Sequence, residues 1–197
     1  FMPVNRSVPD VAQKRKDWNG LISGFKASDL VFLDESGCNT DMTRQYAYSL
    51  GGSRAVDSAP LSKPKNTTIL SSIQLDGTLR YTTFSGGTTV ERFKRYLETD
   101  LLPHLNGNSV LIMDHMKSHH AKAVRNLLDS SGVRYIYLPP YSPDLNPIEK
   151  LWSKVKSFLR KFKARTLDAL PNAIQNAFHS VTVSDCSGWF RFCGYAL

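Results

Sequence analysis

The stretch Leu30-Val31-Phe32-Leu33-Asp34 decides the fold, because four consecutive apolar residues end in an acidic one. Such a run predicts a buried strand that breaks into a loop over residues 34–37. A second apolar run, residues 109–113, ends at Asp114. In open α/β sheets, ligands and catalytic groups gather at the carboxyl ends of the strands. We therefore expect both aspartates at one edge of a sheet.

Local patterns predict the remaining elements. Residues 67–75 and 78–84 are rich in β-forming residues and flank Asp76-Gly77, which predicts a hairpin. Helical crossovers favour parallel neighbours, and the hairpin favours antiparallel ones. The predicted fold is α/β, a mixed five-stranded sheet with helices on both faces. Helices are expected at residues 11–18, 88–102, 121–128, 147–163 and 167–178, and further strands at 46–50 and 133–138.

Composition limits the partners of the protein. The 197 residues include 25 Lys and Arg against 17 Asp and Glu, a net charge of +8, which suits nucleic acid better than a membrane. No stretch approaches the roughly eighteen apolar residues of a membrane span. The three cysteines are too few and too scattered for a disulfide framework, so we expect reduced thiols in a cytosolic protein. Residues 1–29 are predicted as a linker with a helical segment, and the chain as part of a longer protein.

Three acidic residues suggest a metal site. Asp34 and Asp114 follow strands, and Glu149 begins a helix. Carboxylates are the ligands that Mg²⁺ and Mn²⁺ prefer, and two such ions suit phosphodiester chemistry. A purely structural explanation also exists for each acid. Aspartate suits turns, and Glu149 would stand at the third helical position if Asn146 capped the helix.

The combination resembles the mariner superfamily of DDE transposases, especially its bacterial insertion-sequence branch. The most specific match is PYSPDLNPIE, residues 140–149, followed by Leu151-Trp152. The residues around Asp34 and Asp114, together with His119, resemble the two other acidic segments of the family. The interval 149 − 114 = 35 leaves thirty-four residues between the second and third acids, as in the family pattern.

The resemblance implies a ribonuclease H-like catalytic domain over residues 30–197. It implies DNA cleavage at transposon ends and strand transfer into target DNA at TA, with Asp34, Asp114 and Glu149 as catalytic metal ligands. It also implies at least a dimer in the synaptic complex and a cytoplasmic, nucleoid-associated protein. His115 replaces the usual asparagine, and residues 116–118 also depart from the common pattern. Neither change removes an oxygen ligand, so we expect the properties of the metal site to be altered but not lost. The end-recognising helix-turn-helix region is absent from this sequence.

Further residues around these acids have two interpretations. Glu35 and His119 could support the metal ligands, although His119 could equally cap or pack the next helix. The helix after Glu149 has a basic side that either contacts DNA phosphates or is a solvated face. The basic residues are Lys150, Lys154, Lys156, Arg160 and Lys161.

Two other functions stay open at this point. A ribonuclease H-like nuclease or Holliday-junction resolvase would share the acids but lack strand transfer. A decayed or domesticated transposase copy would bind DNA or a partner without cutting. Such decay often removes an acid, and all three acids are present.

Overall fold

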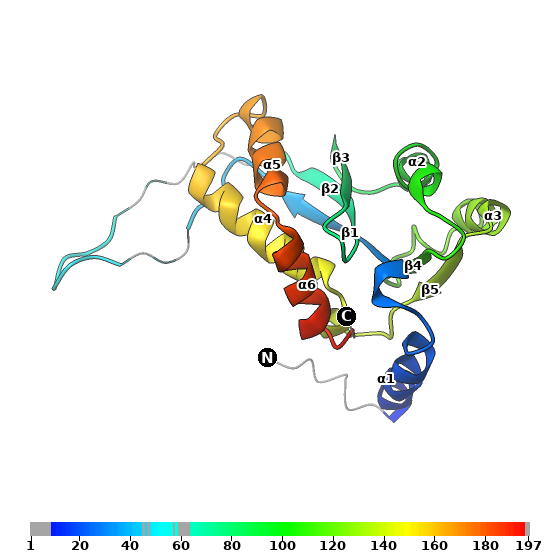
Figure 1. Ribbon diagram of the computed structural model, residues 1–197. Coiled ribbons are helices and arrows are strands. Elements are labelled where there is room, and N and C mark those ends of the chain that lie inside the picture. Colours follow the sequence, from blue (N-terminus) through cyan, green and yellow to red (C-terminus); the bar gives the residue numbers. More distant parts are fainter. Residues whose placement is uncertain (1–8, 45, 47, 57, 59–63, 196–197) are drawn as a thin grey trace.

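The computed structural model describes residues 9–44, 46, 48–56, 58 and 64–195. It contains one five-stranded sheet with the order β3-β2-β1-β4-β5 (Figure 1). β1 pairs antiparallel with β2 and parallel with β4, and β5 is parallel to β4. The predicted mixed sheet is therefore confirmed. Its strands are β1 (Leu30–Cys38), β2 (Thr67–Ile73), β3 (Leu79–Ser85), β4 (Val110–Met113) and β5 (Arg134–Tyr137).

Helices cover both faces of the sheet. In Figure 1, α4, α5 and α6 lie on one side of it and α2 and α3 on the other. Two clusters of buried apolar side chains fill these two interfaces. The helices are α1 (Pro9–Ile22), α2 (Val90–Tyr96), α3 (Lys122–Ser131), α4 (Ile148–Phe162), α5 (Ala169–His179) and α6 (Val183–Phe192), with short turns η2 (Ala27–Asp29), η3 (Leu97–Leu101), η4 (Leu102–His104) and η5 (Pro143–Leu145).

The first strand is longer than its apolar run. The expected break into a loop at Asp34 was wrong, because β1 continues to Cys38. Within β1, only Leu30 to Leu33 pair with β4, whereas the pairing with β2 extends as far as Cys38. Asp34 therefore lies just past the end of the parallel pairing with β4, inside a strand that β2 still supports.

Two other predicted elements differ from the structure. The helix expected over residues 88–102 ends at Tyr96 and continues as the π turn η3 and the short turn η4. Pro103 explains this break, because a proline lacks an N–H group and its ring clashes with the carbonyl four residues before it. The strand expected over 46–50 is absent from the described residues of that range, which form a segment that projects from the body (Figure 1). Residue 47 lies outside the described residues.

Two simpler expectations concern the membrane and the cysteines. Among the described residues, no helix has both the length and the apolar character needed to cross a bilayer. Cys38, Cys186 and Cys193 are free thiols, and all three are buried.

Candidate active site

A cavity of about 600 Å³ opens where the carboxyl ends of β1 and β4 meet the start of α4. All three predicted acids line it, together with Trp152 and the loop that precedes α4. The residues that line the cavity from that loop are Pro139, Pro140, Tyr141, Ser142, Pro143 and Asn146. The structure thus brings together residues that lie more than a hundred positions apart in the sequence.

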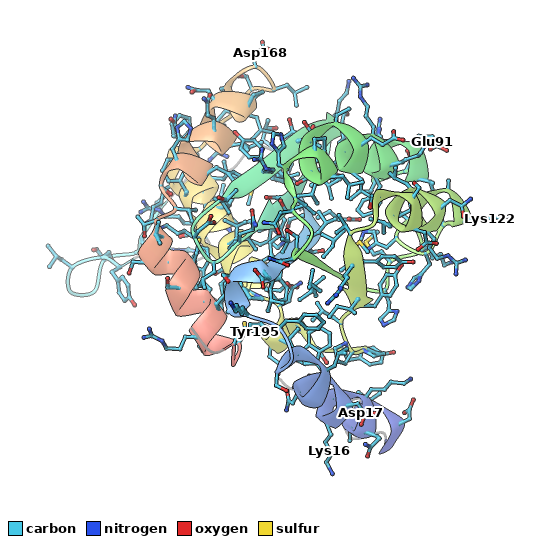
Figure 2. All side chains as sticks on the ribbon, turned by 45° about the vertical axis from the view of Figure 1, so that its right-hand side comes forward. Lys16, Asp17, Glu91, Lys122, Asp168 and Tyr195 are labelled. Atoms are coloured by element: carbon cyan, nitrogen blue, oxygen red, sulfur yellow. The ribbon has the colours of Figure 1, made fainter. Side chains whose placement is uncertain are left out.

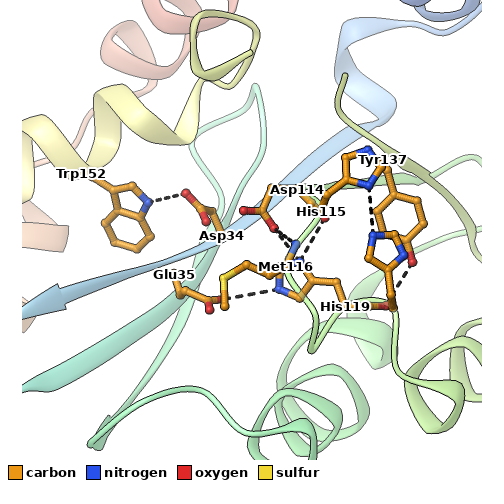
Figure 3. A network of polar contacts seen from close by, with 9 residues as sticks. Asp34, Glu35, Asp114, His115, Met116, His119, Tyr137 and Trp152 are labelled. Atoms are coloured by element: carbon orange, nitrogen blue, oxygen red, sulfur yellow. Dashed lines mark hydrogen bonds and ion pairs between the residues drawn. The ribbon is translucent and has the colours of Figure 1, made fainter. Parts of the chain in front are cut away.

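Asp34 is a buried carboxylate held by one tryptophan. Its side chain is only 8% exposed, and its Oδ2 accepts a hydrogen bond of 3.0 Å from Nε1 of Trp152 (Figure 3). Trp152 follows Glu149 by three positions on α4, so the two side chains leave the helix on the same side. One helix therefore supplies both the third acid and the donor that fixes the first.

Asp114 follows β4 directly and is held by two donors. Its Oδ1 lies 2.8 Å from Nδ1 of His119 and accepts a 2.9 Å hydrogen bond from the N–H of Met116 (Figure 3). Among the described residues, no side chain donates to the second oxygen of either aspartate. Both printed contacts of Asp114 thus fall on Oδ1, whereas Asp34 accepts from Trp152 and also from the Glu35 N–H.

His119 links Asp114 to Glu35. The ring is fully buried and stacks on Phe93 at 4.3 Å. Its Nε2 lies 3.4 Å from Oε2 of Glu35, a long contact that acts as an ion pair. Strand alternation places Glu35 on the opposite face of β1 from Asp34, as the sequence predicts. His119 therefore holds Asp114 through Nδ1 and is itself held by Glu35 through Nε2.

Glu149 stands in the first turn of α4, but the expected cap does not form. The helix begins at Ile148 after Pro147, with no capping hydrogen bond from a side chain. The carbonyl oxygen of the Asn146 side chain is buried and has no hydrogen-bond partner among the described residues. The predicted cap by Asn146 is therefore wrong, although an acid in the first turn of a helix is still favourable by itself.

The negative charges of the three acids, together with burial and hydrogen bonds, shift their pKa values. Burial raises the pKa of Asp34 to about 7, and the charges of Asp114 and Glu149 add to the rise, while hydrogen bonds from Trp152 and the Glu35 N–H oppose it. Burial also raises the pKa of Glu149. The pKa of Asp114 is lowered, because the hydrogen bonds from His119 and Met116 outweigh its partial burial.

The pKa of His119 follows from the same contacts. Its burial lowers this pKa, but the bonds to Asp114 and Glu35 outweigh that effect and raise it to about 9. Around the cavity, protein groups thus compensate Asp114 well and Asp34 poorly.

These residues fit a hard divalent cation. Mg²⁺ and Mn²⁺ prefer oxygen ligands, which the carboxylates provide. Either ion would also neutralise the negative charge of the buried Asp34 carboxylate. Within the described chain, no three His, Cys, Asp or Glu side chains are close enough together to form a ready-made metal site. Mg²⁺ usually binds one or two carboxylates and completes its shell with water and substrate phosphate. The fit therefore rests on the two aspartates, with Glu149 across the cavity.

Comparison with known proteins identifies the family of this chain. A family model described as DDE superfamily endonuclease matches residues 29–171. The chain belongs to this family.

Individual relatives of the DDE domain are transposases. The transposable element Tc1 transposase of Caenorhabditis elegans is 29% identical over 97 residues, which cover 47% of this chain and 36% of that protein. The pre-cleavage Mos1 transpososome matches with a TM-score of 0.78 at 19% identity, over 97% of this chain and 63% of that one. The mariner Mos1 paired end complex with Mg matches with a TM-score of 0.73 at 17% identity, over 98% and 60%.

These likenesses to solved structures confirm the predicted ribonuclease H-like fold. The match of this chain spans about a third of the Tc1 protein and less than two thirds of the Mos1 chains in these two complexes.

Sequence reasoning missed two features of the DDE domain. The hydrogen bond from Trp152 to Asp34 was not predicted, although the place of Trp152 three residues after Glu149 was a usable signal. His115 forms a pair with His120, their ring nitrogens 3.0 Å apart, and both rings stack on Tyr137. The stacking of these histidines on Tyr137 could not be inferred from their spacing, because Tyr137 lies at the end of β5.

The basic side of α4 is partly engaged within the protein. Nζ of Lys150 lies 3.8 Å from the centre of the Phe192 ring, and Lys154 forms a 2.6 Å ion pair with Asp185. Lys150, Lys154 and Lys161 line a groove between α4 and α6. Phe162, the last residue of α4, is 42% exposed.

The raised pKa of Asp34 predicts pH-dependent metal binding. Since the folded pKa of about 7 exceeds the ordinary value of 3.8, this group stabilises the metal-free fold most below pH 4. That contribution is lost as the pH rises through 7. A cation must displace the proton, so the affinity for Mg²⁺ should be about tenfold higher at pH 8 than at pH 6.

Titration calorimetry at both pH values measures this difference. Asp34→Asn should abolish the pH dependence, because the amide does not titrate. Equal affinities of the unaltered chain at pH 6 and pH 8 would contradict the assignment of Asp34 as a ligand.

Proposed function

We propose that this chain is the catalytic domain of a cut-and-paste transposase. The observation that carries the proposal is one cavity lined by two aspartates from neighbouring parallel strands and a glutamate from α4. Among the described residues, no basic side chain pairs with Asp34, so the charged form of this buried carboxyl group is unfavourable unless a cation binds. The relatedness to the Tc1 and Mos1 transposases supports the same function.

Each residue has a definite task in this proposal. Bound Mg²⁺ or Mn²⁺, as two ions, would activate the attacking oxygen and stabilise the leaving oxygen of a phosphodiester. Asp34 and Asp114 would hold the ions, and Glu149 would complete the ligand shell of the second ion. Trp152 and His119 keep the aspartates oriented. The structure of a Mos1 complex with Mg supports this choice of metal.

The substrate is DNA, first the transposon end and then the target at TA. After hydrolysis, the freed 3′-hydroxyl attacks the target in a direct transesterification. Bringing two ends together requires at least two copies of the protein. We further propose residues 30–197 as the catalytic domain after a preceding segment, residues 1–29. We place the protein in the bacterial insertion-sequence branch and at the nucleoid.

DNA phosphates would run along the basic side of α4. The candidates are Lys150, Lys154, Lys156, Arg160 and Lys161. Three of the lysines line the groove between α4 and α6, beside three serine hydroxyl groups. Ammonium and hydroxyl groups both donate to phosphate oxygens. Lys154 already pairs with Asp185, so Lys150 and Lys161 are the better probes of this path.

Neutralising any one acid should stop DNA cleavage but keep the fold. Asp34→Asn, Asp114→Asn and Glu149→Gln should each slow Mn²⁺-dependent nicking by roughly a hundredfold or more, because lost metal ligation removes several kcal/mol of transition-state stabilisation. Asp34→Asn should also keep or raise the melting temperature at pH 8 without metal, since it removes a buried charge.

A gel nicking assay and circular dichroism measure the two effects. Asp168→Asn is the matched control, because Asp168 is exposed at the far end of the molecule (Figure 2). A folded variant of any of the three acids that nicks DNA at the normal rate would remove that acid from the site. An unaltered chain that binds DNA and never cuts it would instead favour a domesticated DNA-binding protein.

If DNA phosphates contact the lysines of the groove between α4 and α6, DNA binding should depend on the salt concentration. Replacing Lys150 and Lys161 together with alanine should weaken binding equally on two unrelated duplexes, because phosphate contacts do not read sequence. The slope of log affinity against log salt should fall by roughly 0.9 for each lost contact.

Lys122→Ala is the control, since Lys122 lies on the opposite side of the molecule from α4 (Figure 2). Fluorescence anisotropy at several salt concentrations measures both slopes. A double variant with the unaltered slope would show that this side of α4 is only a solvated face.

A further inference from the structure

One arginine joins α1 to the loop before α4. Arg15 donates from Nη1 to Oδ1 of Asp144 at 3.1 Å and from Nη2 to Oδ2 at 2.7 Å. Nη1 also lies 2.5 Å from Oγ of Ser142. A planar guanidinium that binds a carboxylate through two parallel hydrogen bonds fixes direction as well as distance. The contact therefore sets the orientation of the loop relative to α1.

This contact is more sheltered than an ordinary surface ion pair. The Arg15 side chain is 24% exposed and that of Asp144 is 39% exposed, and Ser142 is buried. Ser142 also donates from Oγ to the carbonyl of Pro140 at 3.1 Å, so the guanidinium holds a loop residue that is itself tied to the loop backbone. Fully exposed pairs contribute little because water and salt screen them. Here the screening is reduced.

The loop has little regular structure of its own to hold its shape. Tyr141 has a φ of 56°, in the left-handed region that residues other than glycine rarely adopt. The only regular element between β5 and α4 is the three-residue turn η5. A second anchor comes from the C-terminal end, where the hydroxyl of Tyr195 donates to the carbonyl of Leu145. The loop thus keeps its conformation through contacts with distant segments.

The same loop forms a wall of the catalytic cavity and leads directly into α4. Ser142 lines the cavity, and Glu149 follows Asp144 by five positions along the chain (149 − 144 = 5). Any shift of the loop changes the cavity wall and the start of α4 together. α1 itself is fixed to the domain by the buried side chain of Trp18.

We propose that Arg15 is a positioning residue, which fixes the loop over residues 139–146 and through it the placement of Glu149 at the metal site. α1 lies outside the residues that match the family model, 29–171, yet it supplies this contact. The inference rests on the proposed catalytic role of Glu149. A displacement of α1 would therefore loosen the active site without changing any of the three acids.

Variants of Arg15 test the proposal directly. Arg15→Ala should speed hydrogen–deuterium exchange of the loop amides by about tenfold in the metal-free chain, because it removes a charge-assisted bidentate contact. It should also raise the Mg²⁺ concentration needed for half-maximal nicking several-fold, with much of the rate restored at high Mg²⁺. Arg15→Lys keeps the charge but not the paired geometry and should give intermediate values. Lys14→Ala is the matched control, because Lys14 is on the same helix in an exposed pair with Asp10.

The exchange pattern separates positioning from general stability. If exchange in β1 and β4 rises as much as in the loop, or if a folded Arg15→Ala variant keeps normal loop exchange and Mg²⁺ dependence, the proposal is overturned. Should Arg15→Ala fail to fold, Asp144→Asn weakens the same contact and gives the same readouts. The exchange measurement needs no cleavage, so an unaltered chain that never nicks DNA defeats the proposed function but not the role of Arg15 in the loop.

Discussion

The structure depends on one unfavourable feature, the burial of the Asp34 carboxylate between β1 and α4. Burial together with two neighbouring acids raises its pKa to about 7, so near pH 7 the carboxyl group is protonated in about half of the molecules and negatively charged in the rest. Most folds avoid this cost by pairing a buried acid with a base. Here the only side-chain donor among the described residues is the neutral indole of Trp152. Such a site is well suited to a cation that arrives with its substrate.

Residues on the two faces of the sheet hold different acids of this site. On the α2 side of the sheet, His119 and Glu35 hold Asp114 from behind. On the α4 side, the helix fixes Asp34 and carries Glu149. Asp34 lies on β1, Asp114 follows β4 directly and Glu149 lies on α4, so regular elements position all three acids with the precision that phosphodiester chemistry requires. The loop before α4 is the exception, because its shape depends on contacts from both ends of the described chain.

Local sequence predicted most of the fold. Apolar runs located β1 and β4, and Asp76-Gly77 located the hairpin, because these signals act over a few residues. The extension of β1 was missed because only its pairing with β2 stabilises it, and such pairing is not visible in one strand. Asp34 and Asp114 were found because each follows an apolar run, and Glu149 because it ends the motif of residues 140–149. The donor from Trp152 depends on how α4 packs. The contact of Arg15 with Asp144 spans 129 positions, and no local pattern indicates it.

The central claim is that Asp34, Asp114 and Glu149 together form a divalent metal site. A crystal of this chain soaked in Mn²⁺, with diffraction data collected at the manganese absorption edge, tests it most directly. The account predicts anomalous density within ligand distance of Asp34 and Asp114, roughly 2.0–2.6 Å for hard cations with oxygen ligands. Addition of a DNA end should strengthen the density, because phosphate oxygens complete the shell. Strong Mn²⁺ density elsewhere, with none between these two aspartates even in the presence of DNA, would contradict the account.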